Sequence, residues 1–398
     1  FSLQHTLVTN LFFAVLLINF ITLKSMKCNT LISASLLFFS MQIFGQVYTD
    51  KIVGKKNEQL KDSLKTEKYP YALPIWGEKV AQKGYKLPYS AGVSVNYFWQ
   101  ESEIVISNLE VGFNHGPQYN LDEIIRFDKS TVEAGALTIR PDIWLLPFLN
   151  IYGIFGKANT STKINAGVYV PDADNNWSEI ANFSTKANFD ATTVGIGMTP
   201  TIGIGGGWLA LDMNMAWTDI SSLDKPAFSY IFGPRLGKTF KLPKPETNVA
   251  VWVGAFRVHI NGDTNGDLPL SDFIDLSNAQ AKVDSGLAKV SENQTKVDNW
   301  WDGLTPAEQK NPVNVTKHNT ANRALERAGT FLSTLDGALS TASDSSVQYS
   351  LQKRPKDMWN FIIGSQYQFS KHVMFRAEVG FLGSRTQALG SLQYRFGL

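Results

Sequence analysis

The stretch TQALGSLQYRFGL, residues 386–398, shows the pattern on which the fold assignment depends. From Leu392 to Phe396 every second side chain is apolar, and the side chains between them are polar. Successive side chains of a β-strand point to opposite faces, so this stretch has one apolar face and one polar face. The pattern predicts a strand that separates a hydrophobic environment from an aqueous one.

The same alternation recurs upstream. It is clear at 359–369 and 372–382, and similar stretches lie at 103–114, 129–140, 148–157, 189–202, 208–218, 228–240 and 248–260. With the last stretch these make ten candidate strands, and residues 91–99 are an extra strand or a plug. We therefore expect an antiparallel sheet of about 10–12 strands.

Two folds use such strands. A soluble sandwich buries the apolar faces in a core. A transmembrane barrel turns them to lipid and must close on itself, because lipid offers the backbone no hydrogen bonds. Strand length, an N-terminal export signal and aromatic residues near strand ends, such as Trp217 and Trp359, favour the membrane. The sequence predicts an all-β, up-and-down transmembrane barrel over residues 90–260 and 355–398.

Composition agrees with this interpretation. Charged residues make up 18% of the chain, against about 25% in soluble proteins, and aromatic residues reach 12%. The mean hydropathy is −0.12, which is too low for a helical membrane protein. A net charge of +2 argues against a nucleic-acid partner, and the single cysteine, Cys28, excludes a disulfide framework.

Residues 1–45 predict an upstream segment followed by a signal peptide. Met26 and Lys27 supply a positively charged start, residues 31–44 an apolar core, and Gly45 a small residue before the cut. The alternative is one long N-terminal membrane anchor. Residues 46–89 follow as a periplasmic linker or plug segment, charged at first and then rich in proline.

The C-terminal strands resemble those that close bacterial outer-membrane β-barrel proteins, which typically end in an aromatic residue read by the insertion machinery. Here Phe396 takes that place, two residues from the end. The resemblance covers the barrel segments as architecture only. It implies a bacterial outer-membrane location, with membrane lipid and the insertion machinery as partners.

Residues 261–354 interrupt the strand pattern. Apolar residues recur three and four apart from Phe273 to Trp301 and from Ala321 to Ala342, which predicts an inserted α-helical hairpin. The alternative is an irregular polar loop. If the last strand ends in the periplasm, counting back through the short turn at 370–372 places this insert outside the cell.

Oxygen-bearing side chains are concentrated at the start of this insert. They are Asn261, Asp263, Asn265, Asp267 and Asp272. With Gly266 at the sixth position, the spacing resembles an EF-hand calcium loop, although Asn stands first and Asp last. The alternative is a glycine-rich hairpin turn. Ca²⁺ is thus the one cofactor that the sequence suggests.

Charged residues on the polar strand faces are expected to point into the barrel. These lumen-facing residues are Arg257, His259, Arg376, Glu378 and Arg395, with Arg235 if its strand keeps register. In strand 248–260 the apolar face that carries Trp252 is expected to face lipid. Inward charges predict either a wet pore or an internal ion-pair network that blocks it.

Two functions follow from this architecture. The first is a narrow porin-like channel for small polar solutes, with selectivity set by the lumen charges. The second is a closed barrel that displays the helical hairpin for binding or adhesion. No catalytic triad, metal-ligand spacing or phosphate-binding loop is evident, so we expect no enzymatic activity; a hydrolase or acyltransferase site on the outer rim is the alternative.

Overall fold

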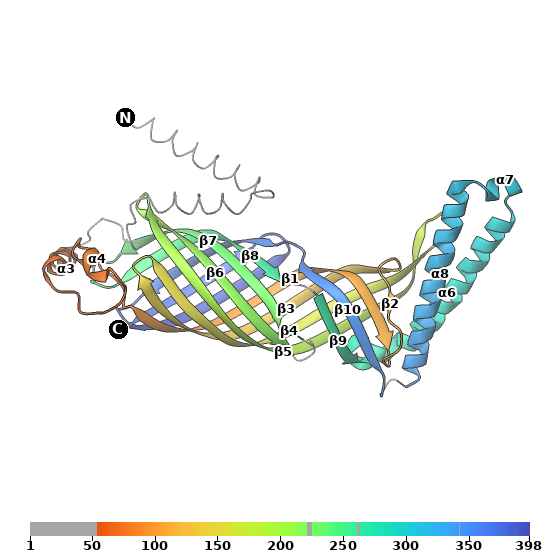
Figure 1. Ribbon diagram of the computed structural model, residues 1–398, viewed down its shortest axis with the longest axis horizontal. Coiled ribbons are helices and arrows are strands. Elements are labelled where there is room, and N and C mark those ends of the chain that lie inside the picture. The colour runs from red at the N-terminus through yellow and green to blue at the C-terminus, as the bar shows by residue number, and fades with distance from the viewer. Residues whose placement is uncertain (1–53, 221–224, 261–262, 342) are drawn as a thin grey trace, which may run out of the picture. The chain divides into compact units, whose positions relative to one another are not determined.

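The computed structural model describes residues 54–220, 225–260, 263–341 and 343–398. The upstream segment and signal peptide predicted for residues 1–45 lie outside these residues. Ten strands form a closed antiparallel barrel (Figure 1). In order around the barrel they are β1 (Ala91–Phe113), β3 (Ile125–Leu146), β4 (Leu149–Pro171), β5 (Trp177–Ile204), β6 (Gly207–Ile220), β7 (Ala227–Lys241), β8 (Asn248–Ile260), β11 (Trp359–Gln368), β12 (Val373–Phe381) and β13 (Arg385–Phe396).

The ring closes where β1 pairs with β13, from Ala91 opposite Phe396 to Ser102 opposite Arg385. Apolar side chains cover its outer surface, and Ile196 and Tyr97 keep 59% and 57% of their area exposed. Polar and charged side chains occupy the inside. Closure pairs every strand edge, and an apolar exterior around a polar interior is the arrangement of a transmembrane barrel. The chain is an outer-membrane β-barrel, as its C-terminal strands predict.

Several strands extend well beyond the length that a membrane needs. β4 and β5 remain paired from Leu149 opposite Pro200 to Pro171 opposite Trp177. The stretch 158–188, which lies between the candidate strands 148–157 and 189–202, is therefore mostly strand, which corrects the predicted strand bounds. Apolar and polar residues still alternate in this extension of β4 and β5, because one face of it is also covered. The cover there is protein instead of lipid.

The first barrel strand is likewise displaced from its predicted position. Residues 91–102 of β1 belong to the barrel, whereas the predicted strand 103–114 lies beyond it. From Ile104 onward β1 pairs with β10 (Ser346–Pro355), which in turn pairs with β9 (Asp263–Pro269). A short strand, β2 (Tyr119–Asn120), also pairs with β1. Periodicity cannot reveal this change of partner, because both halves of β1 alternate.

These extensions and the helices form what we call the distal domain, residues 104–130, 162–190, 263–341 and 343–355. Its helices are α5 (Leu270–Phe273), the 3-10 turn η2 (Leu276–Asn278), α6 (Ala279–Asp302), α7 (Pro306–Gln309) and α8 (Pro312–Leu339). Helices α6 and α8 pair with each other, and α6 also packs on β5 while α8 packs on β4. None of the helices in the described residues is both long and apolar enough to cross a membrane.

One continuous hydrophobic core joins the sheet and the hairpin. Val168 and Val170 of β4, Leu325 and Leu332 of α8 and Val347 of β10 are all almost completely buried. Gly286 permits the close approach of α6, since a Cβ there would lie 2.9 Å from a Leu332 methyl and 3.3 Å from Ala181. The helical stripe therefore packs against strands as well as within the hairpin.

Leu332→Ala should loosen this core without disturbing the barrel. Leu332 is fully buried, so the truncation should cost about 2–5 kcal/mol of distal-domain stability. Limited proteolysis of the folded protein should then cleave the hairpin faster, while the barrel fragment survives. Val313→Ala on the same helix is the control, because Val313 is 62% exposed and should change little. Equal cleavage rates for the two variants would contradict the shared core.

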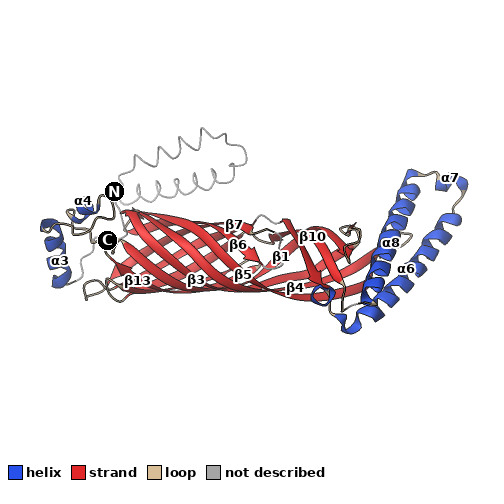
Figure 2. Ribbon diagram, turned by 60° about the horizontal axis from the view of Figure 1, so that its bottom comes forward, coloured by secondary structure: helices blue, strands red, loops and turns tan. Residues whose placement is uncertain are grey.

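The opposite end of the barrel carries residues 54–90, which we call the cap. It contains α3 (Lys55–Thr66) and α4 (Gly77–Ala81), seen at the end that also holds the C-terminus (Figure 2). Ala72 N–H donates to the Leu398 carbonyl at 2.9 Å, and Ile75 N–H donates to that of Leu145 at 3.0 Å. The segment predicted as a linker or plug therefore binds the barrel rim.

The cap predicts a pH dependence. Burial lowers the pKa of Lys86 to about 8, and Glu246, 3.5 Å away in the β7–β8 turn, only partly offsets this. Between pH 7 and pH 9 the unfolded chain holds the Lys86 proton more tightly than the folded chain, so stability rises with pH. The expected gain is about 1 kcal/mol. Urea unfolding of the native chain at both pH values should show this gain in stability. An equal gain in a Lys86→Met variant would refute the role of Lys86.

Candidate functional site: the barrel interior

A network of charged side chains occupies the middle of the bore. Arg235 of β7 binds Glu378 of β12 through two hydrogen bonds, Nε to Oε2 at 2.7 Å and Nη2 to Oε1 at 3.0 Å. Its Nη1 donates to Asp212 of β6 at 3.1 Å. Strands β7 and β12 are separated by β8 and β11, so this pair reaches across the bore. Bidentate arginine–carboxylate pairs of this kind are strong and geometrically specific.

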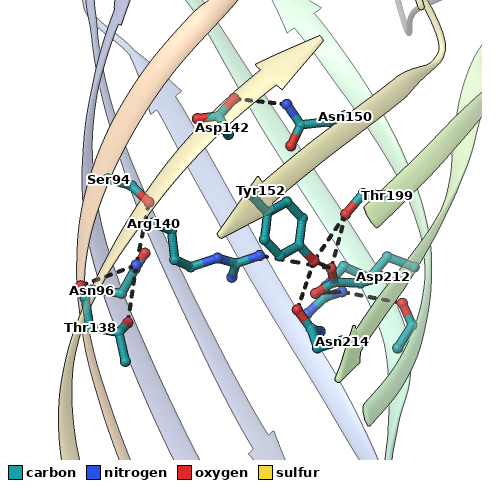
Figure 3. Close-up of polar contacts among 12 residues, drawn as sticks. Ser94, Asn96, Thr138, Arg140, Asp142, Asn150, Tyr152, Thr199, Asp212 and Asn214 are labelled. Carbon is teal, nitrogen blue, oxygen red and sulfur yellow. Dashed lines mark hydrogen bonds and ion pairs between the residues drawn. The ribbon is translucent and has the colours of Figure 1, made fainter. Parts of the chain in front are cut away.

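Further side chains extend the network to the other wall. Tyr152 of β4 donates its hydroxyl to Asp212, and Thr199 of β5 donates to the same carboxylate at 2.9 Å. The guanidinium of Arg140 on β3 lies 3.9 Å above the Tyr152 ring. Figure 3 shows these residues converging on Asp212. The connected side chains therefore span from β3 to β12.

Aromatic rings fill space around the network by lying against glycines of neighbouring strands. Trp252 of β8 covers Gly364 of β11, and Tyr152 covers Gly197 of β5, so closely that a Cβ at either glycine would overlap the ring. Trp252 Nε1 also donates to Glu378 at 2.8 Å. Glycine is required at these positions because only a missing side chain lets the ring lie flat on the barrel wall.

A second polar layer lies toward the cap. Asp142 of β3 accepts from Arg395 of β13 at 2.9 Å and from Gln393 at 2.6 Å. Asn150 of β4 donates to Asp142 Oδ1, the oxygen that Arg395 also contacts, at 2.7 Å. Arg395 Nε donates to the Tyr89 carbonyl at 3.0 Å, which joins this layer to the cap.

The layer toward the distal domain combines apolar side chains with the buried polar residues Asn360, Gln387 and Arg385. Phe98 of β1 and Phe256 of β8 stack with ring centroids 6.4 Å apart, although three strands separate β1 from β8 on the shorter arc. Ile362 is completely buried and Val258 nearly so. The inward side chains thus form a mixed layer of aromatic, aliphatic and polar groups toward the distal domain and two charged layers toward the cap.

The predicted lumen-facing residues divide between the two faces. Glu378 and Arg395 are buried in the bore, Arg376 lies beside Glu378 at 3.3 Å, and Arg235 joins them. Arg257 and His259 lie on the outer face, which corrects the prediction.

The register of β8 explains this. Arg257 lies opposite Trp359, which faces outward, and its guanidinium lies 6.0 Å from that ring. Trp252 and Phe256 take the inner face because the bore offers Glu378 and Phe98 as partners. Alternation shows which residues share a face of a strand, but it does not show which of the two faces points into the barrel.

The calcium-loop prediction is wrong for the described residues. Its members are Asn261, Asp263, Asn265, Asp267 and Asp272, of which Asn261 lies outside the described residues. Residues 263–269 form strand β9, and Gly266 pairs with Tyr349 instead of making a turn. A strand cannot wrap its alternating side chains around one ion. No group of three or more His, Cys, Asp or Glu in the described part of the chain could hold a metal.

Four of the network residues, Arg140, Tyr152, Thr199 and Asp212, are not among the lumen-facing residues that the sequence predicts. Gly197, which the Tyr152 ring covers, is a signal for Tyr152 only once the strand register is known.

Comparisons with known proteins add the following. No protein-family model matches this sequence, nor does any curated protein. Among solved structures, the translocator domain of the autotransporter NalP from Neisseria meningitidis matches with a TM-score of 0.31 and 8% identity, covering 86% of this chain and 94% of that one. The β-domain of the Bordetella autotransporter BrkA gives 0.28 and 8%, covering 77% and 100%.

An outer-membrane channel from Pseudomonas putida F1 gives a TM-score of 0.25 and 10% identity, covering 78% of this chain and 97% of that one. Scores this low carry no inference about activity. The outer-membrane assignment rests on the closed barrel and its apolar exterior.

Proposed function

We propose that this chain is a closed outer-membrane barrel that anchors the distal domain for binding or adhesion. The observation that supports this is the set of side-chain contacts between strands that are not neighbours in the barrel wall. The Arg235–Glu378 pair reaches across the bore, and the Phe98–Phe256 stack lies above. A buried, bidentate ion pair is not a lining that solutes displace readily, because breaking it leaves uncompensated charges.

The distal domain supplies a second reason. It has its own hydrophobic core, which a pore rim does not need. Ion pairs also join α8 to the turn between β2 and β3: Arg323 and Arg327 of α8 contact the Glu123 carboxylate at 2.7 and 2.8 Å. A rigid, independently packed module is suited to presenting a surface to a partner.

Planar-bilayer recording of the folded protein tests the closed barrel. We expect no unitary conductance from the native chain. Reproducible openings of one size, seen in independent preparations and absent from protein-free membranes, would overturn the proposal.

A narrow channel for small polar solutes is the second candidate. An excess of cationic groups in the bore favours it. Arg140, Arg235 and Arg376 meet only two carboxylates in the central network, those of Asp212 and Glu378. A channel lined in this way should prefer anions. Openings with anion selectivity in the same recordings would support this function over the first.

We also propose that the distal domain lies outside the cell. The C-terminal strand ends at the cap, and its likeness to closing strands assigns that end to the periplasm. Protease added to intact cells should therefore cleave at Lys310, which is exposed between α7 and α8. Cleavage at Lys65 in the cap should require permeabilisation of the outer membrane. Cleavage at Lys65 in intact cells, with cleavage at Lys310 only after permeabilisation, would show that the distal domain lies in the periplasm.

The proposal assigns no catalysis and no cofactor to the chain. An anchoring role requires none of the side chains in the bore to react.

A further inference from the structure

A row of small side chains crosses the lipid-facing wall of the barrel. The strand register pairs each member of this row with the next one around the wall. The members are Val251 of β8, Ser365 of β11, Ala377 of β12 and Gly390 of β13. Ala377 and Gly390 carry almost no side chain, and nothing lies within 4 Å of where a Gly390 Cβ would be. We call this row the trough.

Side chains that are all at least as large as Val251 border the trough on both sides. Toward the distal domain the next row is Leu236, Val253, Ile363 and Val379. Toward the cap it is Phe240, Val249, Tyr367, Phe375 and Leu392. A cavity of about 630 Å³ lies over part of the trough. Neighbouring strands are about 4.8 Å apart, so four strands make the trough about 14 Å long.

A positive charge lies at one end. Lys238 of β7 is opposite Val251 and so continues the row, and it is exposed on the outer wall. Its Nζ lies 5.8 Å from the Phe240 ring. A lysine among lipid-facing side chains is costly unless it reaches the interface or an anion. Lys238 is three residues from the end of β7, where a lipid headgroup lies within reach.

We propose that the trough binds one acyl chain of an anionic phospholipid, whose phosphate pairs with Lys238. The lipid-facing position of the wall commits the occupant to a membrane lipid. The narrow, apolar shape suits a single hydrocarbon chain, and the charge at its end selects the headgroup. The small residues serve this function because any larger side chain would fill the space.

Native mass spectrometry tests the proposal. The protein is folded in detergent with equal amounts of phosphatidylglycerol and phosphatidylcholine, and retained lipid is measured. We expect one phosphatidylglycerol per barrel, favoured at least tenfold. Lys238→Gln should abolish the preference between headgroups while a lipid is still retained. Ala377→Leu combined with Gly390→Leu should abolish retention of both lipids.

Ala255→Leu is the matched control. Ala255 lies opposite Phe361 on the lipid-facing wall but outside the trough, so the same enlargement there should leave lipid retention unchanged. Heat-modifiable migration in gels checks that each variant is folded. The proposal is overturned if a folded Ala377→Leu and Gly390→Leu variant retains as much phosphatidylglycerol as the native chain. It is also overturned if the native chain shows no headgroup preference.

Discussion

Replacing Glu378 with alanine is expected to destabilise the folded barrel by about 3–5 kcal/mol, because it removes one partner from a buried ion pair. The Glu378 carboxylate accepts from Arg235, Trp252 and Arg376. All three donors would lose a partner at once, in a bore where only 4% of Glu378 is exposed. Urea unfolding of the protein in detergent, followed by tryptophan fluorescence, measures the loss.

The control for this change is Glu103→Ala. Glu103 also pairs with two cations, Lys129 and Lys356, but at the surface, where exposed ion pairs contribute little. Its unfolding midpoint should stay near that of the native chain. Glu378→Gln should fall between the two, since it keeps the shape and loses the charge. Equal midpoints for Glu378→Ala and Glu103→Ala would mean that the central network does not stabilise the barrel.

Gly364→Ala is expected to impair closure of the barrel, although it adds a single methyl group. The new Cβ would overlap the Trp252 ring. If the ring moves away, Trp252 loses its 2.8 Å hydrogen bond to Glu378. Overpacking of this kind typically costs about 1–3 kcal/mol, and the lost hydrogen bond adds to it. The folded fraction after refolding, measured by heat-modifiable migration, should fall.

Gly390→Ala provides the comparison, because it adds the same methyl group where nothing lies within 4 Å. It should fold as well as the native chain. A double-mutant cycle identifies the cause. Trp252→Leu should cost less stability in the Gly364→Ala background than in the native chain, because there the loss of the ring also relieves the clash. Additive effects would show that Gly364 does not act through the Trp252 ring.

Much of the barrel could be predicted from sequence because each barrel strand separates two environments. The last three strands, β11 to β13, follow the predicted alternation, with Ile363, Val379 and Leu392 exposed outside. The predicted number of ten strands agrees with the barrel. The first strand, however, is formed by residues 91–102 and not by the predicted residues 103–114. Its partner changes from β13 to β10 near Ser102, where the alternation does not change.

The interior was harder to predict for a physical reason. Asp212, Arg235 and Glu378 lie far apart in the sequence, on strands that are not all neighbours, and meet only because the sheet curves into a ring. No local pattern records that meeting. Strand β8 shows the same limit: alternation separated Trp252 from Arg257, but only the presence of Glu378 in the bore decides that the tryptophan points inward.

The amino-acid sequence by itself determined that the chain forms amphipathic strands, that their apolar faces suit lipid, and that a helical hairpin interrupts them. These properties depend on residues two, three or four positions apart, which share a face whatever the rest of the chain does. Only the tertiary structure decided that charged side chains of distant strands meet in the bore, that strands and hairpin share one distal core, and that a trough crosses the outer wall. Each of these depends on which strands are neighbours and in which register, and closure of the ring sets both.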